Sequence, residues 1–149
     1  GLKNLSFLTC HPKDTTKELF ELIRDVPVIS KGLHMPLQSG SDRILKAMNR
    51  GYTCKKYLNL IDEYRSLVYN GKVSTDVIVG FPGETDKDFQ DTLDLMKKVR
   101  FDAAYIFKYS PRPNTKASQM EDSVPQKVKE KRHAELLKMQ RAIAKGKAH

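Results

Sequence analysis

Cysteine is scarce in this sequence, and the two cysteines present exclude several kinds of site. Cys10 and Cys54 lie 44 positions apart in 149 residues, a separation that fits neither a metal-ligand pair nor a C-x-x-C redox motif. No apolar run approaches the roughly 20 residues that a membrane-spanning helix needs. The sequence does not begin with Met and has no recognisable signal peptide. We therefore expect reduced thiols in a cytoplasmic protein with no membrane contact, processed or cut from a longer chain.

Acidic residues are fewer than basic ones. The chain has 27 Lys and Arg against 18 Asp and Glu, a net charge of +9. An excess of this sign suits a polyanionic partner such as nucleic acid, because phosphates attract Lys and Arg. A soluble basic domain without such a partner explains the same number, and the charge alone favours that simpler interpretation.

The stretch Val73–Asp88 (VSTDVIVGFPGETDKD) predicts a strand, a loop and a helix in succession. The β-branched run Val73–Val79 is typical of a strand buried on both faces, and Gly80–Gly83 ends it. Parallel α/β proteins carry their chemistry on loops beyond the carboxyl ends of strands. Asp76 in the strand and Glu84 on the loop are therefore candidates. The loop lacks the lysine or repeated glycines of a phosphate cradle, so a phosphate-binding lyase ranks last.

The rest of the chain alternates between strand and helix patterns. We expect further strands over Leu5–Thr9, Gly32–Leu37 and Phe101–Tyr109, and helices beginning after Thr15, Ser39 or Ser41, Thr53, Thr85 and Pro125. Thr15 and Glu18 have the spacing of a capping box. The alternation indicates parallel strands joined by right-handed crossovers. Since a closed eight-stranded barrel needs about 200 residues, we predict an α/β half-barrel or a small open sheet with four parallel strands.

Polar residues follow two of the other strands. Gln38 and Ser39 offer an amide and a hydroxyl at a strand end; helix capping by Ser39 or Ser41 is the simpler role for the serines, but it does not explain Gln38. Arg112 is either a solvated loop cation or an anion clamp. The helix after Pro125 has eight basic residues, which we interpret mostly as a solvated face, with a weak RNA-facing role as the alternative.

Three runs of the sequence resemble the radical S-adenosylmethionine (SAM) methylthiotransferases. They are His34–Thr53 (HMPLQSGSDRILKAMNRGYT), Thr75–Thr85 (TDVIVGFPGET) and Phe101–Thr115 (FDAAYIFKYSPRPNT). The last run favours the branch that acts on N6-dimethylallyladenosine in tRNA. The ribosomal-protein S12 branch usually reads LQHAS where this chain has Leu37–Ser41 (LQSGS). The threonylcarbamoyladenosine branch shares QSGSDRIL and GFPGET, so both other branches stay as alternatives.

The resemblance implies a partial (β/α)6 barrel. Residues 1–124 would supply its C-terminal four strands, and residues 125–149 a basic helix leading towards an RNA-binding TRAM domain. Such enzymes use a [4Fe-4S] cluster to cleave SAM to a 5′-deoxyadenosyl radical and a second cluster to deliver sulfur. They add a methylthio group at C2 of an adenosine next to the anticodon, so the implied partner is the tRNA anticodon stem-loop, and we expect a monomer.

The family's cluster-binding CxxxCxxC motif and its TRAM domain are absent from this sequence. Three thiolates are needed to hold such a cluster and leave one iron for SAM, and Cys10 and Cys54 cannot supply them. We therefore expect a fragment that is inactive alone, with no metal ligand or catalytic group of its own. A basic RNA-interaction fragment without catalysis is the alternative from another functional class.

The resemblance also implies a SAM pocket formed by Gln38, Ser39, Asp76, Ile78, Gly80, Tyr109, Ser110 and Arg112. The first two would lie near the ribose or methionine of SAM, the next three would line the cofactor, and the last three would close the pocket or meet RNA. In the superfamily's GxIxGxxE pattern, Gly83 stands where the acid belongs and Glu84 is one place late. We therefore expect Glu84 to cap or brace the loop.

Overall fold

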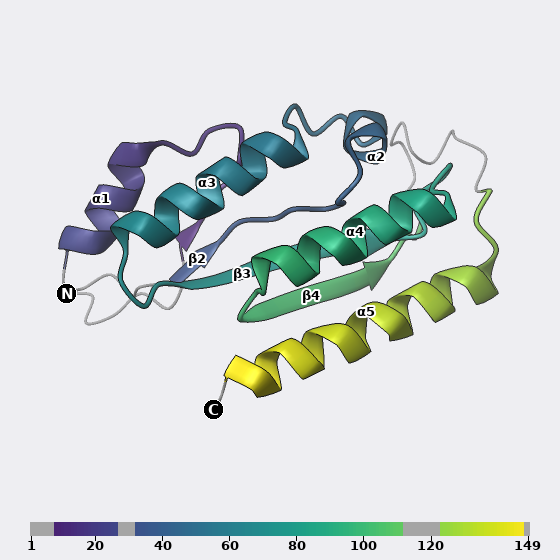
Figure 1. Cartoon of the computed structure of the whole chain (residues 1–149). Helices are drawn as coiled ribbons and strands as arrows, with labels where there is room; N and C mark the ends of the chain where they lie inside the picture. Colours follow the sequence, from purple (N-terminus) through teal and green to yellow (C-terminus); the bar gives the residue numbers. More distant parts are fainter. Residues whose placement is uncertain (1–7, 27–31, 112–122, 148–149) are drawn as a thin grey trace.

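The computed structural model describes residues 8–26, 32–111 and 123–147 and has a sheet of four parallel strands in the order β1-β2-β3-β4. The strands are β1 (Leu8–Thr9), β2 (Gly32–His34), β3 (Lys72–Val79) and β4 (Ala103–Lys108). The helices are α1 (Lys17–Asp25), α2 (Asp42–Ala47), α3 (Cys54–Leu67), α4 (Asp86–Val99) and α5 (Gln126–Lys147). The predicted α/β class with four parallel strands is confirmed (Figure 1).

The two faces of the sheet differ because side chains alternate along each strand. Val73, Val77 and Val79 of β3 are fully buried in the core with residues of α3 and α4. Asp76 and Ile78 lie on the opposite face and are only partly buried. On β4, Tyr105 and Phe107 pair in register with them and are 56% and 52% exposed. Helices thus cover one face, while the other is open to solvent, as in half of a barrel.

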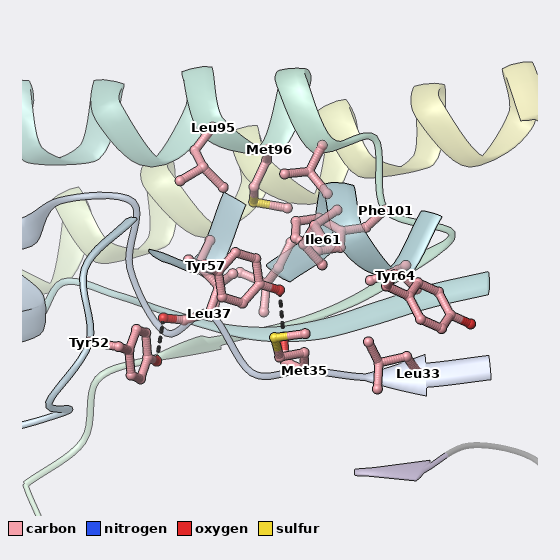
Figure 2. Packing of buried hydrophobic residues seen from close by; sticks show 14 of the residues in the cluster. Leu33, Met35, Leu37, Tyr52, Tyr57, Ile61, Tyr64, Leu95, Met96 and Phe101 are labelled. Atoms are coloured by element: carbon pink, nitrogen blue, oxygen red, sulfur yellow. Dashed lines mark hydrogen bonds between the residues drawn. The ribbon is translucent and has the colours of Figure 1, made fainter. Parts of the chain in front are cut away.

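The segment after β2 is held by side chains instead of a continuous ladder. The sequence predicts a strand to Leu37, but β2 ends at His34 because Pro36 has no N–H to donate. Tyr57 donates its hydroxyl to the Met35 carbonyl at 2.6 Å, and Tyr52 donates to the Leu37 carbonyl at 2.8 Å (Figure 2). These two tyrosines anchor the chain that leads into the Gln38 loop.

The sequence predicts a threonine or serine cap at the start of four helices, and two of these caps are confirmed. Thr53 accepts a hydrogen bond from the Lys56 N–H, and Thr85 forms a capping box with Asp88. The capping box at Thr15 is wrong: Thr16 is the N-cap, and the Thr15 hydroxyl donates to the His11 carbonyl at 2.7 Å.

Ser41 is the N-cap of α2, but its side chain does not cap that helix. Its hydroxyl donates instead to the Asp88 carboxylate of α4 at 2.8 Å. Ser39 accepts the Ser41 N–H at 3.1 Å. The two serines therefore close the loop and join it to α4, where the sequence suggested a simple cap.

Helix α5 runs along the outer side of β4 (Figure 1). Lys129 Nζ lies 3.5 Å from the Tyr109 carbonyl, His133 Nε2 lies 2.8 Å from the Ile106 carbonyl, and Gln140 Nε2 donates to the Phe101 carbonyl at 2.9 Å. Lys129 and Arg132 are 3% and 6% exposed, so the solvated face expected for the basic residues is wrong for these two. Within the described part of the chain, no helix combines the length and apolar character required to cross a bilayer.

Candidate functional site

Gln38 is the most unusual residue at the carboxyl edge of the sheet. Its φ of 73° lies in the left-handed region, which costs a residue with a Cβ roughly 1–2 kcal/mol. Its side-chain Oε1 is buried and has no hydrogen-bond partner among the described residues. Strained backbone and an unsatisfied buried acceptor are both features that cluster at ligand sites. Gln38 Oε1 is therefore an acceptor that a ligand at this edge could use.

Asp76 and Ile78 lie directly beside Gln38. The Gln38 N–H donates to the Asp76 carbonyl at 2.8 Å, and the Ile78 N–H donates to the Gln38 carbonyl at 2.9 Å. This pair of bonds extends the sheet past Pro36 and brings together three of the predicted site residues. Asp76 presents its carboxylate, and Ile78 its apolar side chain, on the open face.

A polar chain on the open face includes two residues that the sequence analysis missed. His34 Nε2 lies 3.2 Å from the Asp76 carboxylate, and His34 Nδ1 lies 2.7 Å from the Ser74 hydroxyl. The His34 ring is also 6.0 Å from the Tyr105 ring. The parallel register pairs His34 with Ser74, so the register, and not any local motif, is the signal that identifies this cluster. It can orient the Asp76 carboxylate towards a hydroxyl or ammonium donor.

Gly80 makes the turn after β3, and Glu84 braces it. Gly80 has a φ of 77°, and its N–H donates to Glu84 Oε1 at 2.9 Å. Arg132 of α5 donates to the same carboxylate oxygen at 2.7 Å and to Asp86 at 2.9 Å. Burial raises the pKa of Glu84, while the Gly80 N–H and the Arg132 charge oppose that rise. The expected bracing role of Glu84 agrees with this geometry.

Four predicted site residues remain, and the three that the structure describes range from fully buried to exposed. Ser39 is fully buried, and its hydroxyl is used within the loop. Tyr109 packs edge-on against Phe81 at 5.3 Å, next to the Gly80 turn, with Lys129 Nζ 5.2 Å from its ring centre. Ser110 is exposed. Arg112 lies outside the described residues.

The cysteines offer no cluster site. Among residues 8–26, 32–111 and 123–147, no three His, Cys, Asp or Glu side chains gather where they could hold a metal ion. Cys10 and Cys54 are free thiols. Burial, with a contribution from Asp42, raises the pKa of Cys54 to about 12, far from the thiolate form that binds iron. The described residues therefore do not fit an iron–sulfur cluster.

Curated relatives match almost the whole chain. Proteins named tRNA-2-methylthio-N(6)-dimethylallyladenosine synthase are 49% identical in Endomicrobium trichonymphae, 48% in Acetivibrio thermocellus and 47% in Aquifex aeolicus. The alignments cover 97%, 97% and 96% of this chain, but 34%, 30% and 32% of the relatives. The chain thus spans about a third of the length of these proteins.

A solved structure supports the fold. Coproporphyrinogen III oxidase (HemN) from Escherichia coli, described as a radical SAM enzyme, superposes with a TM-score of 0.76 over 92% of this chain and 32% of its own, at 18% identity. The family model of the radical SAM superfamily matches residues 1–96, which include the Gln38 loop, β3 and the Gly80 turn. With its parallel half-barrel and this match over most of its length, the chain belongs to the radical SAM superfamily.

Proposed function

We propose that this chain is the C-terminal part of the radical SAM domain of a tRNA methylthiotransferase of the MiaB type, tRNA-2-methylthio-N6-dimethylallyladenosine synthase. The complete enzyme would add a methylthio group at C2 of the modified adenosine next to the anticodon. The observation that carries the proposal is the 46–49% identity to synthases of that name over at least 96% of the chain. The half-barrel would occupy residues 1–124, and residues 125–149 would lead towards a further domain.

The proposed SAM pocket lies at the carboxyl edge of β2, β3 and β4. The unsatisfied Gln38 Oε1 would accept a hydrogen bond from the ribose or the methionine ammonium, and Asp76 would accept another. Ile78 would lie against the adenine, and the absence of a side chain at Gly80 would let SAM approach the backbone. When bound, SAM supplies the 5′-deoxyadenosyl radical; the residues of this chain bind and orient it.

Ser39, Tyr109, Ser110 and Arg112 complete the proposed pocket in less direct ways. Ser39 would act through the shape of its loop, since its hydroxyl is engaged there. Tyr109 and the exposed Ser110 would border SAM or RNA, with Arg112 beyond them. We propose that both [4Fe-4S] clusters bind elsewhere in the complete protein and that these residues alone are inactive.

A basic stripe on α5 supports a tRNA partner. It consists of Lys127, Lys131, Lys138, Arg141 and Lys145, all exposed. Their spacing places them within an arc of about 80° and along about 27 Å of the helix. The stripe is opposite the buried face that holds Leu136 and Ile143. A row of cations of this kind matches RNA phosphates, and the proposal places the enzyme in the cytoplasm as a monomer on the anticodon stem-loop.

The test uses the complete gene product with reconstituted clusters, and it measures SAM affinity by calorimetry and methylthiolation of tRNA by nucleoside mass spectrometry. Gln38→Asn keeps a residue that tolerates left-handed backbone but withdraws the amide by one methylene. Loss of one hydrogen bond, about 1 kcal/mol, should weaken SAM binding by about fivefold. Gln90→Asn, an exposed amide on α4, is the matched control and should bind SAM as the wild type does.

Two results would contradict the proposed enzymatic function. If the wild type neither binds SAM nor methylthiolates tRNA, the proposed function is wrong. If it binds RNA in a strongly salt-dependent way while ignoring SAM, the non-catalytic RNA-interaction role replaces it.

A further inference from the structure

Three groups from two distant parts of the chain meet in one buried chain of hydrogen bonds. The Gly80 N–H donates to Glu84 Oε1 at 2.9 Å, and Arg132, 48 residues further on, donates to the same oxygen at 2.7 Å. We infer that Arg132 is a positioning residue that holds the Gly80 turn in place through Glu84. The inference rests on the proposed function, because the turn borders the proposed SAM pocket.

Glu84 depends on Arg132 for its charge. The Glu84 side chain is 1% exposed and that of Arg132 is 7% exposed, and a buried carboxylate without a counter-charge takes up a proton instead. A neutral carboxyl is a weaker acceptor than a carboxylate. Without the guanidinium, the bond from the Gly80 N–H would therefore weaken even though Glu84 itself is unchanged.

The guanidinium holds the loop at more than one point. Besides the Glu84 carboxylate, Arg132 Nη1 donates to the Glu84 carbonyl at 3.2 Å, and Nη2 donates to Asp86 at 2.9 Å. The guanidinium carbon also lies 5.5 Å from the centre of the Phe89 ring. A planar fork with several fixed donors can make these contacts together, while a lysine ammonium cannot reproduce the geometry.

Helix α5 contacts the turn a second time through Lys129, nearly one helical turn before Arg132. A Cβ added to Gly80 would collide with the aliphatic stem of Lys129, so the side chain packs directly on the glycine. The Lys129 ammonium reaches the Tyr109 carbonyl at 3.5 Å. The position of α5, which lies beyond residues 1–96 of the family match, thus decides the shape of the edge where SAM would bind.

The variants for the test are Arg132→Met, which removes the charge and keeps the apolar stem, Arg132→Lys, which keeps only the charge, and Glu84→Gln. In the complete gene product, Arg132→Met should weaken SAM binding at pH 7 by about tenfold, measured by calorimetry without turnover. Arg132→Lys should lose less. Lys97→Met, an exposed cation on α4, is the control and should bind SAM as the wild type does.

The pH dependence of SAM binding distinguishes a positioning role of Arg132 from a purely structural one. Among the described residues, Arg132 and Asp88 act on the Glu84 carboxyl, Asp86 shares the Arg132 guanidinium, and Lys129 packs on the adjacent Gly80. Burial raises the pKa of Glu84 and the Arg132 charge opposes that rise, so Arg132→Met should raise this pKa further. SAM affinity in Arg132→Met should therefore recover severalfold relative to the wild type as the pH is raised and Glu84 ionises. In Glu84→Gln the loss should not recover, and adding Arg132→Met should weaken binding by less than twofold more.

Hydrogen exchange supplies a measurement that does not depend on SAM. The Gly80 amide, followed in a peptide that spans residues 78–84, should exchange at least tenfold faster in Arg132→Met than in the wild type. If Arg132→Met does not fold, Arg132→Lys carries the same comparison. Equal exchange and equal SAM affinity in the wild type and the Arg132 variant would overturn the inference while leaving the proposed function intact. Failure of the wild type to bind SAM would overturn both.

Discussion

Replacing Asp88 with Ala should destabilise the domain far more than any other acidic substitution on α4. The Asp88 carboxylate accepts hydrogen bonds from the Ser41 hydroxyl at 2.8 Å, the Thr85 N–H at 2.8 Å and the Thr85 hydroxyl at 2.9 Å. It also pairs with Arg43. The side chain is 8% exposed, so one carboxylate joins the loop before α2 to the start of α4.

The size of the loss follows from these contacts taken one at a time. Removing half of the capping box at Thr85 costs about 1 kcal/mol. Leaving the buried Ser41 hydroxyl without its acceptor costs about 1–3 kcal/mol. The Arg43 side chain is 58% exposed, so its ion pair adds at most about 1 kcal/mol. The free energy of unfolding should therefore fall by about 2–5 kcal/mol in Asp88→Ala, and by less in Asp88→Asn, which retains one acceptor.

The loss should also depend on pH. Burial of Asp88 acts to raise its pKa, but the bonds from Arg43, Thr85 and Ser41 outweigh it and hold the pKa well below its usual range. A carboxyl whose pKa is lower in the folded state stabilises the protein above its unfolded pKa near 4, and that stabilisation disappears as the pH falls towards the folded value. The difference between the wild type and Asp88→Asn should therefore shrink below about pH 4.

Urea unfolding of the complete gene product at pH 7 and at pH 3 measures both effects. Asp94→Ala replaces an exposed acid on the same helix, which accepts from the exposed Gln90. It is the control and should change stability by less than about 0.5 kcal/mol. A loss below about 1 kcal/mol in Asp88→Ala, or a loss for Asp88→Asn that is equal at both pH values, would refute the reasoning.

Three further predictions concern other parts of the structure. Gly40→Ala should destabilise the protein by about 2 kcal/mol or more in thermal unfolding, because its Cβ would lie 2.5 Å from the Thr92 Cα. Gly146→Ala in α5, where the added Cβ would make only an ordinary contact 3.6 Å from an Arg100 nitrogen, should be neutral or stabilising; equal losses would contradict this. Replacing Lys131, Lys138 and Arg141 of the basic stripe with Gln should weaken tRNA binding and lower the slope of log K against log salt concentration by about 2–3. An unchanged slope would show that the stripe does not contact tRNA. The Cys54 thiol should react slowly with iodoacetamide at pH 8, because burial, the largest effect, and Asp42 raise its pKa to about 12. Its labelling rate should rise about tenfold per pH unit up to pH 11. Fast labelling at pH 8 would show that the thiol is not buried in this way.

Local sequence patterns were sufficient for the order of the strands and helices and for naming Gln38, Asp76 and Ile78, which the structure brings together. Hydrophobic periodicity and the caps at Thr53 and Thr85 report on residues close together in the chain, and these predictions are confirmed. The helix after Thr15 also forms, but the competing bond to the His11 carbonyl moves its start by one residue. Whether a threonine hydroxyl donates to an earlier carbonyl or accepts from an N–H of the first helical turn is not visible in residue types alone.

The residues that the sequence analysis missed are those whose partners are far away in the chain. His34 forms a cluster only with Ser74 and Asp76, and no local motif predicts the strand register that brings them together. Arg132 reads as one more cation on a polar helix, and only the packing of α5 brings it to Glu84. The left-handed backbone of Gln38 is equally hidden, since nothing but tertiary context holds it there.

The position of α5 has a consequence for how the sheet can grow. A strand is extended only by another strand that reaches its free backbone groups, and three carbonyls in and beside β4 already receive side chains of α5. Helix α5 thus terminates the sheet at β4. A strand contributed by the rest of a longer protein would then pair at β1, because β1 is the other edge of this sheet. In a longer protein, an edge covered in this way would leave the β4 side of the sheet without a further strand, and the face that carries Asp76 would stay accessible from that side.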